Sequence, residues 1–270
     1  MRDGTPQNAP RETTPVVAVW PIAPALVLGQ VLADAIGGVV RTVEPWAAAS
    51  ALEAGTADLA LVPTLDVLRA PESVSLAPVC GLAGEASPFR VLAVGVPLNE
   101  ITTVAFDPRF GQEALLAQLI LREHFDVRPS FTPVETASAA SVAEHGAALV
   151  ATDADLPEAT VTLDLGREWS DLTLRPMVWG LVASRPGAMN EADALALAEA
   201  ADKAGDPTGT GQYQLALTGL GYEGLEAFAD HLFYTGSIPA IPELPFVAIQ
   251  PEDDGPDALE KVAESGVRDS

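Results

Sequence analysis

Cysteine and lysine are almost missing from this chain of 270 residues, which contains one cysteine, Cys80, and two lysines, Lys203 and Lys261. A single cysteine excludes an internal disulfide and a metal site built from cysteines, so Cys80 is expected to be a small buried apolar residue. The 14 Lys and Arg residues stand against 38 Asp and Glu, which gives a formal net charge of −24. A surface with this charge repels a nucleic-acid duplex and an anionic bilayer, so we expect neither nucleic acid nor a membrane as a partner.

Long apolar runs are also missing, since none reaches the roughly 18 residues that a membrane-spanning helix needs. Residues 1–15 are polar, contain three prolines and lack the apolar region of a secretory signal, so they are expected to form a disordered leader of a cytoplasmic protein. The acidic stretch 251–270 is expected to be a flexible tail. Lysine depletion together with acid excess is typical of adaptation to a salty cytoplasm, so the protein is interpreted as halophilic.

Apolar residues, by contrast, make up 48% of the chain, enough for one large core or two smaller ones. Short apolar segments such as 16–19, 57–64 and 102–106 alternate with helical patterns such as 25–36 and 112–125. This alternation is typical of βαβ units and predicts an α/β fold with mainly parallel sheets. Residues 161–169 are expected to form a strand, and residues 212–220 a helix.

Polar and turn-forming residues follow several of the expected strands. In parallel sheets, ligands bind beyond the carboxyl ends of the strands. Those ends lie at 20–24, 63–64, 107–111 and 152–155, and a segment near 97–101 divides them into two groups. We therefore expect two lobes with a ligand cleft between them. Lobe 1 would contain residues 16–98 and 186–250, and lobe 2 would contain residues 99–185.

Four segments resemble one known family in sequence and in spacing. They are ADLALVPTLDVLR, VPLNEITTVAFDPRFGQEALLAQLILREHF, AALVATDADL and LDLGREWSDLTLRPMVWGLVASRPG. The family is that of chorismate dehydratase, in the futalosine pathway of menaquinone biosynthesis, and the resemblance covers about residues 16–238. It implies a two-lobed fold of the periplasmic-binding-protein type (type 2), located in the cytoplasm. It also implies a lyase that removes water from chorismate, a small dicarboxylate, to give 3-[(1-carboxyvinyl)oxy]benzoate without a metal or other cofactor.

The resemblance also implies where the substrate binds. Ala23 stands where the family has an active-site Asn, Arg90 stands for a ligand-facing serine, and Thr64 conservatively replaces another serine. A hydroxyl-rich loop corresponds to residues 109–113, and a Gly-Asp pair to Thr152 and Asp153. The expected substrate-binding residues are Trp20, Ala23, Thr64, Arg90, Arg109, Gly111, Gln112, Thr152 and Asp153. No residue is assigned a catalytic role, and no metal ligand is expected.

Several of these residues have two interpretations. Arg109 lies at the amino end of a helix, where a cation is misplaced unless an anion is near, so it either clamps a substrate carboxylate or pairs with one of the many acids. Arg90 lies in an apolar run, where it either faces the cleft or pairs with an acid such as Asp66. Asp107 precedes a proline and is expected to cap the following helix rather than act as a base. Trp20 either forms a wall of the pocket or packs in the core.

Three functions remain open at this point. The first is a chorismate dehydratase-like lyase. The second is a non-catalytic cytoplasmic protein that binds a small carboxylate, which the replaced Asn and serine favour. The third is a sibling reaction on a futalosine-type substrate, which the histidines argue against: His124, His145 and His231 lie in helical stretches without a matching nucleophile.

Overall fold

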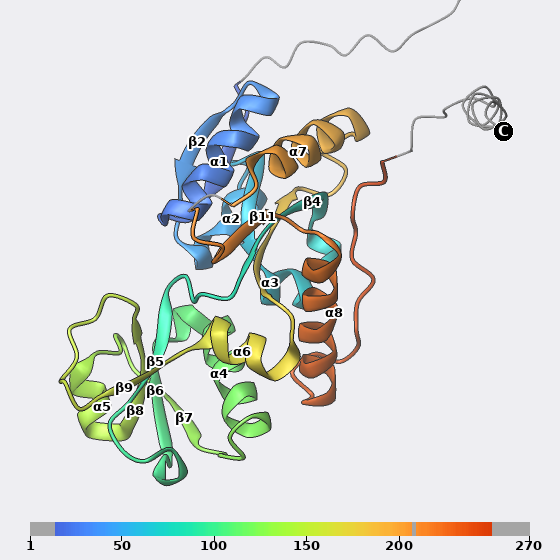
Figure 1. Ribbon diagram of the computed structural model, residues 1–270. Coiled ribbons are helices and arrows are strands. Elements are labelled where there is room, and N and C mark those ends of the chain that lie inside the picture. Colours follow the sequence, from blue (N-terminus) through green and yellow to red (C-terminus); the bar gives the residue numbers. More distant parts are fainter. Residues whose placement is uncertain (1–13, 207–208, 250–270) are drawn as a thin grey trace, which may run out of the picture.

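A computed structural model describes residues 14–206 and 209–249, which form two lobes, each built on a sheet covered by helices (Figure 1). The expected tail 251–270 lies outside the described residues. So does the expected leader 1–15, apart from its last two residues.

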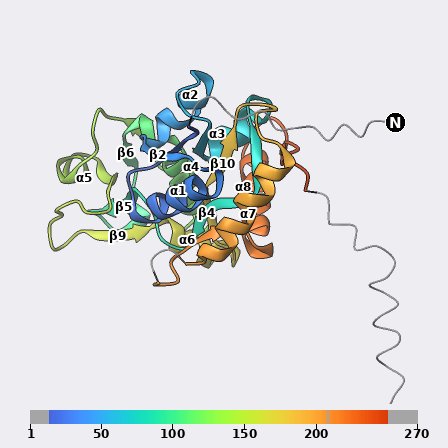
Figure 2. The ribbon, with the colours of Figure 1, turned by 90° about the horizontal axis from the view of Figure 1, so that it is seen from above.

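The first lobe contains a six-stranded sheet whose strands β1 and β3 are buried. The strand order is β11 (Tyr213–Ala216), β4 (Ser75–Gly84), β10 (Met177–Ser184), β3 (Leu59–Pro63), β1 (Val16–Val19) and β2 (Val39–Thr42). Strand β1 is parallel to β2 and β3, and the other pairs are antiparallel. The sheet is accompanied by α1 (Ala23–Ile36), α2 (Ala48–Glu53), α3 (Thr64–Arg69) and α7 (Glu191–Ala204). Helices α1 and α7 pack against each other, as the view from above shows (Figure 2).

The second lobe contains a five-stranded sheet. The strand order is β7 (Ser130–Pro133), β6 (Thr103–Phe106), β8 (Gly146–Ala151), β5 (Arg90–Val94) and β9 (Val161–Asp164). Strand β6 is parallel to β7 and β8, whereas β5 is antiparallel to β8 and β9. The helices of this lobe are α4 (Gly111–Glu123), α5 (Ala139–His145) and α6 (Leu165–Thr173). Short 3-10 turns, η1 (Pro45–Ala47) and η4 (Pro108–Phe110), precede α2 and α4.

The α/β two-lobed fold is as predicted, but the sheets are mixed rather than mainly parallel. The chain crosses between the lobes twice, from β4 to β5 and from β9 through α6 to β10. The strand that follows each crossing, β5 or β10, runs opposite to the βαβ strands of its sheet and is therefore antiparallel to both of its neighbours.

The sheet membership also differs from the expected lobe boundaries. Strand β5 belongs to the second sheet, although it falls within 16–98, and β10 belongs to the first sheet, although it falls within 99–185. The turn-forming prolines Pro97 and Pro186 come after β5 and β10, whereas the chain crosses between the lobes before each of these strands. Turn residues alone therefore do not locate the crossings.

One expected element is wrong in type, and another is wrong in extent. The predicted helix 212–220 contains β11, where Tyr213 and Leu215 are buried and Gln214 between them is exposed, which is the period of two that an edge strand requires. The predicted strand over 161–169 stops at Asp164, because the Asp164 carboxylate accepts the backbone N–H groups of Gly166 and Arg167 and so caps α6.

The two crossing segments lie side by side. Ser87, in the first crossing, donates its backbone N–H and its hydroxyl to the Asp164 carboxylate. A Cβ placed on Gly166 would lie 2.8 Å from the Glu85 carbonyl, so only glycine allows the second crossing to approach this closely. The buried Trp169 of α6 packs edge-to-face on Phe228 of the long helix α8 (Gly219–Tyr234), with ring centroids 5.8 Å apart. These contacts fix the junction between the lobes.

Candidate functional site

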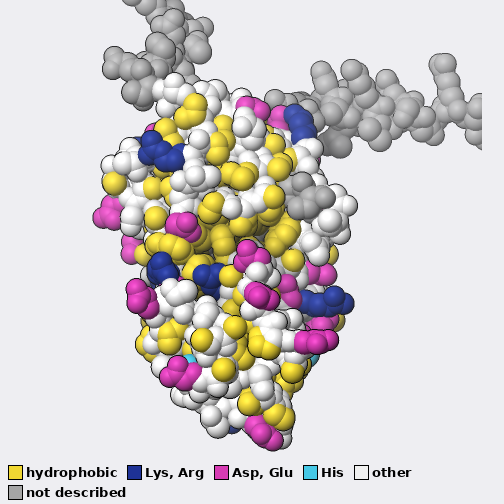
Figure 3. All heavy atoms as spheres, turned by 90° about the vertical axis from the view of Figure 1, so that its left-hand side faces the viewer, with side chains coloured by type: hydrophobic (Ala, Val, Ile, Leu, Met, Phe, Trp, Pro, Cys, Tyr) yellow, Lys and Arg dark blue, Asp and Glu magenta, His cyan; other side chains and the backbone are white. Residues whose placement is uncertain are grey.

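A cavity of about 250 Å³ lies between the lobes. It is found where β1, β3 and β6 end, as expected for the ligand site of an α/β sheet. Its lining residues are Trp20, Pro45, Trp46, Pro63, Leu65, Asp66 and Arg69 from the first lobe, and Pro88, Phe89, Pro108, Arg109, Gly111, Gln112 and Glu113 from the first crossing and the second lobe. At the height where the lobes meet in Figure 1, hydrophobic side chains form a band across one face, with Lys or Arg side chains just below it (Figure 3).

Aromatic rings cross the junction beside the cavity. Phe110 is 5% exposed and lies with its ring centroid 5.2 Å from Trp46 and 6.0 Å from Phe89. Phe89 in turn lies 5.5 Å from Trp20, whose indole N–H is buried without a hydrogen-bond partner among the described residues. The rings give the site an apolar wall for a flat ligand and leave one buried donor. Trp20 thus lines the cavity and is also part of the core.

Gln112 links the lobes through its side-chain amide. It is 7% exposed; its Oε1 accepts the Leu65 backbone N–H at 2.8 Å, and its Nε2 donates to the Trp179 carbonyl at 2.9 Å. Leu65 lies in α3 and Trp179 in β10, both in the first lobe, whereas Gln112 lies in the first turn of α4 in the second lobe. One residue expected to bind substrate therefore also holds the two lobes together.

Arg109 lines the cavity and pairs with Asp107, its neighbour two residues earlier. Its Nε donates to both Asp107 carboxylate oxygens, at 2.9 and 3.0 Å, and its guanidinium carbon lies 5.1 Å from the centre of the Trp46 ring. Asp107 also accepts the Arg109 backbone N–H, which confirms its predicted capping role. Burial opposes ionisation of Asp107, but the hydrogen bonds from Arg109 outweigh it and hold the pKa of this carboxyl below its usual range.

Arg90 packs beside the cavity. Its guanidinium carbon lies 3.6 Å above the Phe110 ring, and its Nη1 donates to the Phe89 carbonyl at 2.9 Å. Burial lowers the pKa of Arg90, while the negative charges of Glu113, Asp107 and Asp153 oppose that shift. The guanidinium is thus a partly desolvated cation at the edge of the aromatic cluster.

Glu113 is a feature that the sequence reasoning missed. It lines the cavity, is 5% exposed, and burial raises its pKa to about 7; a hydrogen bond to its own backbone and the charge of Arg90 act against the shift. Asp66 lines the same cavity from the other lobe, and its pKa is also raised, by partial burial, with Arg69 opposing. The available signal was helical spacing, since Glu113 shares one face of α4 with the buried residues Leu116 and Ile120.

Only some of the nine expected binding residues line the cavity. Trp20, Arg109, Gly111 and Gln112 line the cavity. Arg90 packs on Phe110 beside it. The lining does not include Ala23, Thr64, Thr152 or Asp153.

The structure shows where each residue outside the lining lies instead. Thr64 is fully buried and donates its hydroxyl to the Val178 carbonyl at 2.7 Å, so that this hydroxyl is engaged by β10. Ala23 begins α1 with its side chain exposed. Thr152 and Asp153 are exposed just after the end of β8, where the Thr152 backbone N–H donates to the Phe89 carbonyl without either residue joining the lining.

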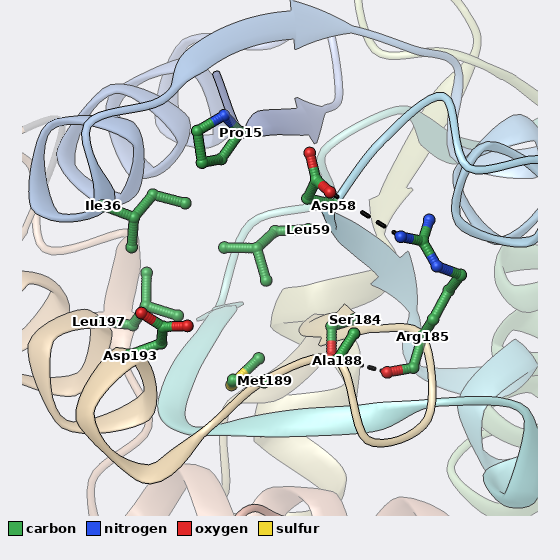
Figure 4. A pocket seen from close by; sticks show the side chains of 10 residues that line it. All are labelled: Pro15, Ile36, Asp58, Leu59, Ser184, Arg185, Ala188, Met189, Asp193 and Leu197. Carbon is green, nitrogen blue, oxygen red and sulfur yellow. Dashed lines mark hydrogen bonds and ion pairs between the residues drawn. The ribbon is translucent and has the colours of Figure 1, made fainter. Parts of the chain in front are cut away.

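A second cavity of about 310 Å³ lies in the first lobe, beside the start of β3 and the end of β10 (Figure 4). The Asp58 carboxylate there accepts the Val16 backbone N–H at 2.9 Å and lies 3.8 Å from the Arg185 guanidinium. Arg185 also donates to the carbonyls of Leu52 and Ala57. These groups tie the loops of one lobe together, so we place the candidate site in the cavity between the lobes.

Three further observations concern the classes of site considered from the sequence. Cys80 is fully buried and burial raises its thiol pKa to about 12, as expected for an apolar core residue. Within residues 14–206 and 209–249, no group of three or more His, Cys, Asp or Glu residues is arranged to hold a metal ion. None of the helices in those ranges combines the length and apolar character needed to cross a membrane.

The sequence profile of a family described as menaquinone biosynthesis matches residues 16–208, well over half of the chain. The chain belongs to this menaquinone biosynthesis family. Membership confirms the resemblance found in the sequence and gives the protein a role in that pathway. A search of the curated proteins finds no match.

Solved structures show that the fold of this family member is that of two-lobed binding proteins. Protein AF1704 from Archaeoglobus fulgidus has a TM-score of 0.55 and 15% identity, over 83% of this chain and 98% of its own. An ABC transporter protein from Parabacteroides distasonis has a TM-score of 0.58 and 15% identity, over 89% of this chain and 100% of its own. The alkanesulfonate-binding protein SsuA from Xanthomonas axonopodis pv. citri, bound to MOPS, has a TM-score of 0.52 and 16% identity, over 87% of this chain and 96% of its own. At these identities the likeness establishes the periplasmic-binding-protein-like fold alone.

Proposed function

We propose that this member of the menaquinone biosynthesis family is a chorismate dehydratase-like lyase. It would act in the cytoplasm and convert chorismate to 3-[(1-carboxyvinyl)oxy]benzoate in the futalosine pathway. The observation that carries the proposal is the cavity between the lobes of a chain that belongs to this family, since both lobes contribute aromatic and ionisable side chains to it. Such clefts are the usual ligand sites of two-lobed α/β folds.

The chemistry of the cavity supports a carboxylate substrate with a six-membered ring. Trp20, Trp46 and Phe89 supply flat apolar walls, and Arg69 and Arg109 supply positive charge at the lining, with Arg90 close by. Because a net charge of −24 opposes the approach of an anion, the gathering of three arginines at one cavity favours an anionic ligand, which would compete with Asp107 for Arg109. Closure of the lobes would exclude water from the reaction.

A second candidate function is a non-catalytic binding protein for a small carboxylate. The observation that favours it is the engagement of polar groups by the protein itself. The Thr64 hydroxyl is bound to Val178, Gln112 is bound to Leu65 and Trp179, and Ala23 offers no hydrogen-bonding side chain. Under this proposal the same cavity holds a carboxylate through Arg109 without turning it over.

The test is incubation of the full chain with chorismate at high salt. The lyase predicts loss of chorismate and formation of the aromatic product, followed by ultraviolet absorbance and identified by mass spectrometry. Calorimetric binding of chorismate without product would support the binding protein instead. If chorismate is neither bound nor converted, both proposals are contradicted. A futalosine-type substrate would then be tested in the same way.

A further inference from the structure

Arg69, the last residue of α3, lines the cavity from the first lobe, although the sequence reasoning did not select it. Its side chain is exposed, and in the part of the chain that the structure describes its guanidinium makes no hydrogen bond and no ion pair. Its charge acts on Asp66 of the same helix only from beyond ion-pair distance. A cation at the carboxyl end of a helix is favourable without using its N–H donors. The donors of Arg69 are therefore free for a ligand, even in a protein with 38 acidic residues.

Arg109 lines the same cavity from the second lobe, and in contrast to Arg69 its guanidinium is held in place. Its Nε and Nη2 donate to the Asp107 carboxylate, Nη2 also donates to the Glu135 carbonyl at 3.3 Å, and the guanidinium carbon lies 5.1 Å from the centre of the Trp46 ring. Its Nη1 makes no hydrogen bond within the described residues, and 49% of the side chain is exposed. The second lobe thus offers an oriented cation with donors still available.

We propose that Arg69 and Arg109 form a two-sided clamp, in which Arg69 binds one carboxylate of the ligand from the first lobe and Arg109 binds a second carboxylate from the other lobe. This inference rests on the proposed function, lyase or binding protein, because that function places the ligand in this cavity. Two cations at one cavity repel each other, and an anionic group on each removes the repulsion.

The separate surroundings of the two arginines favour two carboxylates over a single one bridged by both. Arg109 already shares its charge with Asp107, which limits what it gives to a ligand. Arg69 has no such partner, and its long flexible side chain can follow a carboxylate that Arg109 does not reach. The Trp46 and Phe89 rings at the cavity would hold the body of the ligand between its charged ends.

The experiment uses two unreactive aromatic probes, benzoate with one carboxylate and isophthalate with two, and measures their Kd by calorimetry on the full chain at one fixed salt concentration. We expect wild type to bind isophthalate at least about 10-fold more tightly than benzoate, the usual effect of one added charge-assisted hydrogen bond. Arg69→Gln should bring the two Kd values close together. The control is Arg128→Gln, which removes a positive charge that is 72% exposed and outside the cavity lining, and it should keep the wild-type ratio.

The ratio of the two Kd values decides the proposal. A wild type that binds both probes equally, or that does not bind isophthalate, would overturn the clamp, and this result needs no variant to fold. An Arg69→Gln protein that keeps the wild-type ratio would overturn the role of Arg69. Loss of the ratio in Arg128→Gln would show that the general field of the protein, and not Arg69, selects the dianion. A protein that binds isophthalate through Arg69 but converts no chorismate would support the clamp and overturn the lyase alone.

Discussion

Gln112 and Glu113 are neighbours in the first turn of α4, yet they have different tasks. The Gln112 amide makes two buried hydrogen bonds to backbone groups of the other lobe, whereas the carboxyl of Glu113, also a lining residue, is hydrogen-bonded to its own backbone. Buried polar groups are stable only when paired, so the Gln112 contacts fix how the lobes meet. A change at Gln112 therefore affects both the junction and the lining of the site.

Replacing Gln112 tests its role as the link between the lobes. Gln112→Ala leaves the Leu65 N–H and the Trp179 carbonyl buried without partners, so we expect the free energy of unfolding to fall by about 2 to 4 kcal/mol. The matched control is Gln118→Ala, an exposed position on the same helix, which should change stability by no more than about 0.5 kcal/mol. Urea unfolding followed by circular dichroism measures both. Equal effects of the two variants would show that the Gln112 bridge does not form in solution.

At this scale the sequence predicted part of the site. The resemblance directed attention to residues 109–113, and Arg109, Gly111 and Gln112 do line the cavity. It did not single out Glu113, because an acid in the first turn of a helix is ordinarily a solvated residue near the helix amino end. Nor did it show that the Thr64 hydroxyl is bound to Val178, since that partner lies 114 residues away in the chain. Such contacts depend on tertiary packing, which a local pattern does not contain.

At the scale of the elements, α8 approaches the start of β10 through a glycine. A Cβ on Gly224 would lie 2.2 Å from the Pro176 carbonyl oxygen, a contact that only movement of the backbone could relieve. About one and two turns further along α8, Phe228 and His231 pack on Trp169 of α6. The position of α8 against the junction thus depends on the missing side chain of Gly224.

Gly224→Ala should therefore destabilise the protein despite the better helix propensity of alanine. We expect a loss of about 1 to 3 kcal/mol, the usual cost of overpacking, measured as a lower urea midpoint. Gly219 of the same helix is the control, since a Cβ there meets nothing within 4 Å, and Gly219→Ala should be neutral or slightly stabilising. If Gly224→Ala proves as stable as Gly219→Ala, the close approach of α8 to Pro176 is wrong.

The order of elements was largely predictable, whereas their pairing was not. Alternation of apolar strands and amphipathic helices indicated the α/β class, and the strand ends at 20, 63 and 107–111 do converge on the cavity. Strand β11 was predicted as part of a helix, because four residues of an edge strand carry a weak period and pair only with the distant β4. The reversed direction of β5 and β10 follows from where the chain crosses between the lobes, which is a non-local property.

For the molecule as a whole, the excess of negative charge is the dominant electrostatic feature. With 38 acidic and 14 basic residues, compaction brings like charges together, and each lobe repels the other. Within the site, ion pairs such as that of Arg109 with Asp107 reduce the repulsion between negative charges locally. The remaining repulsion acts across the surface, where salt screens it.

Stability should therefore increase with ionic strength. Raising NaCl from about 0.1 to 1 M shortens the screening length from about 10 to 3 Å, and we expect the Tm at pH 7 to rise by about 5 °C, equivalent to about 2 kcal/mol at the usual few degrees per kcal/mol. At pH 4.5, close to the pI of about 4.2, the net charge is small, so the same salt step should have little effect. Calorimetry at both pH values measures the difference. A Tm that rises equally at pH 7 and pH 4.5 would mean that salt acts on apolar burial rather than on charge repulsion, and that the acidic surface does not limit the stability of this fold.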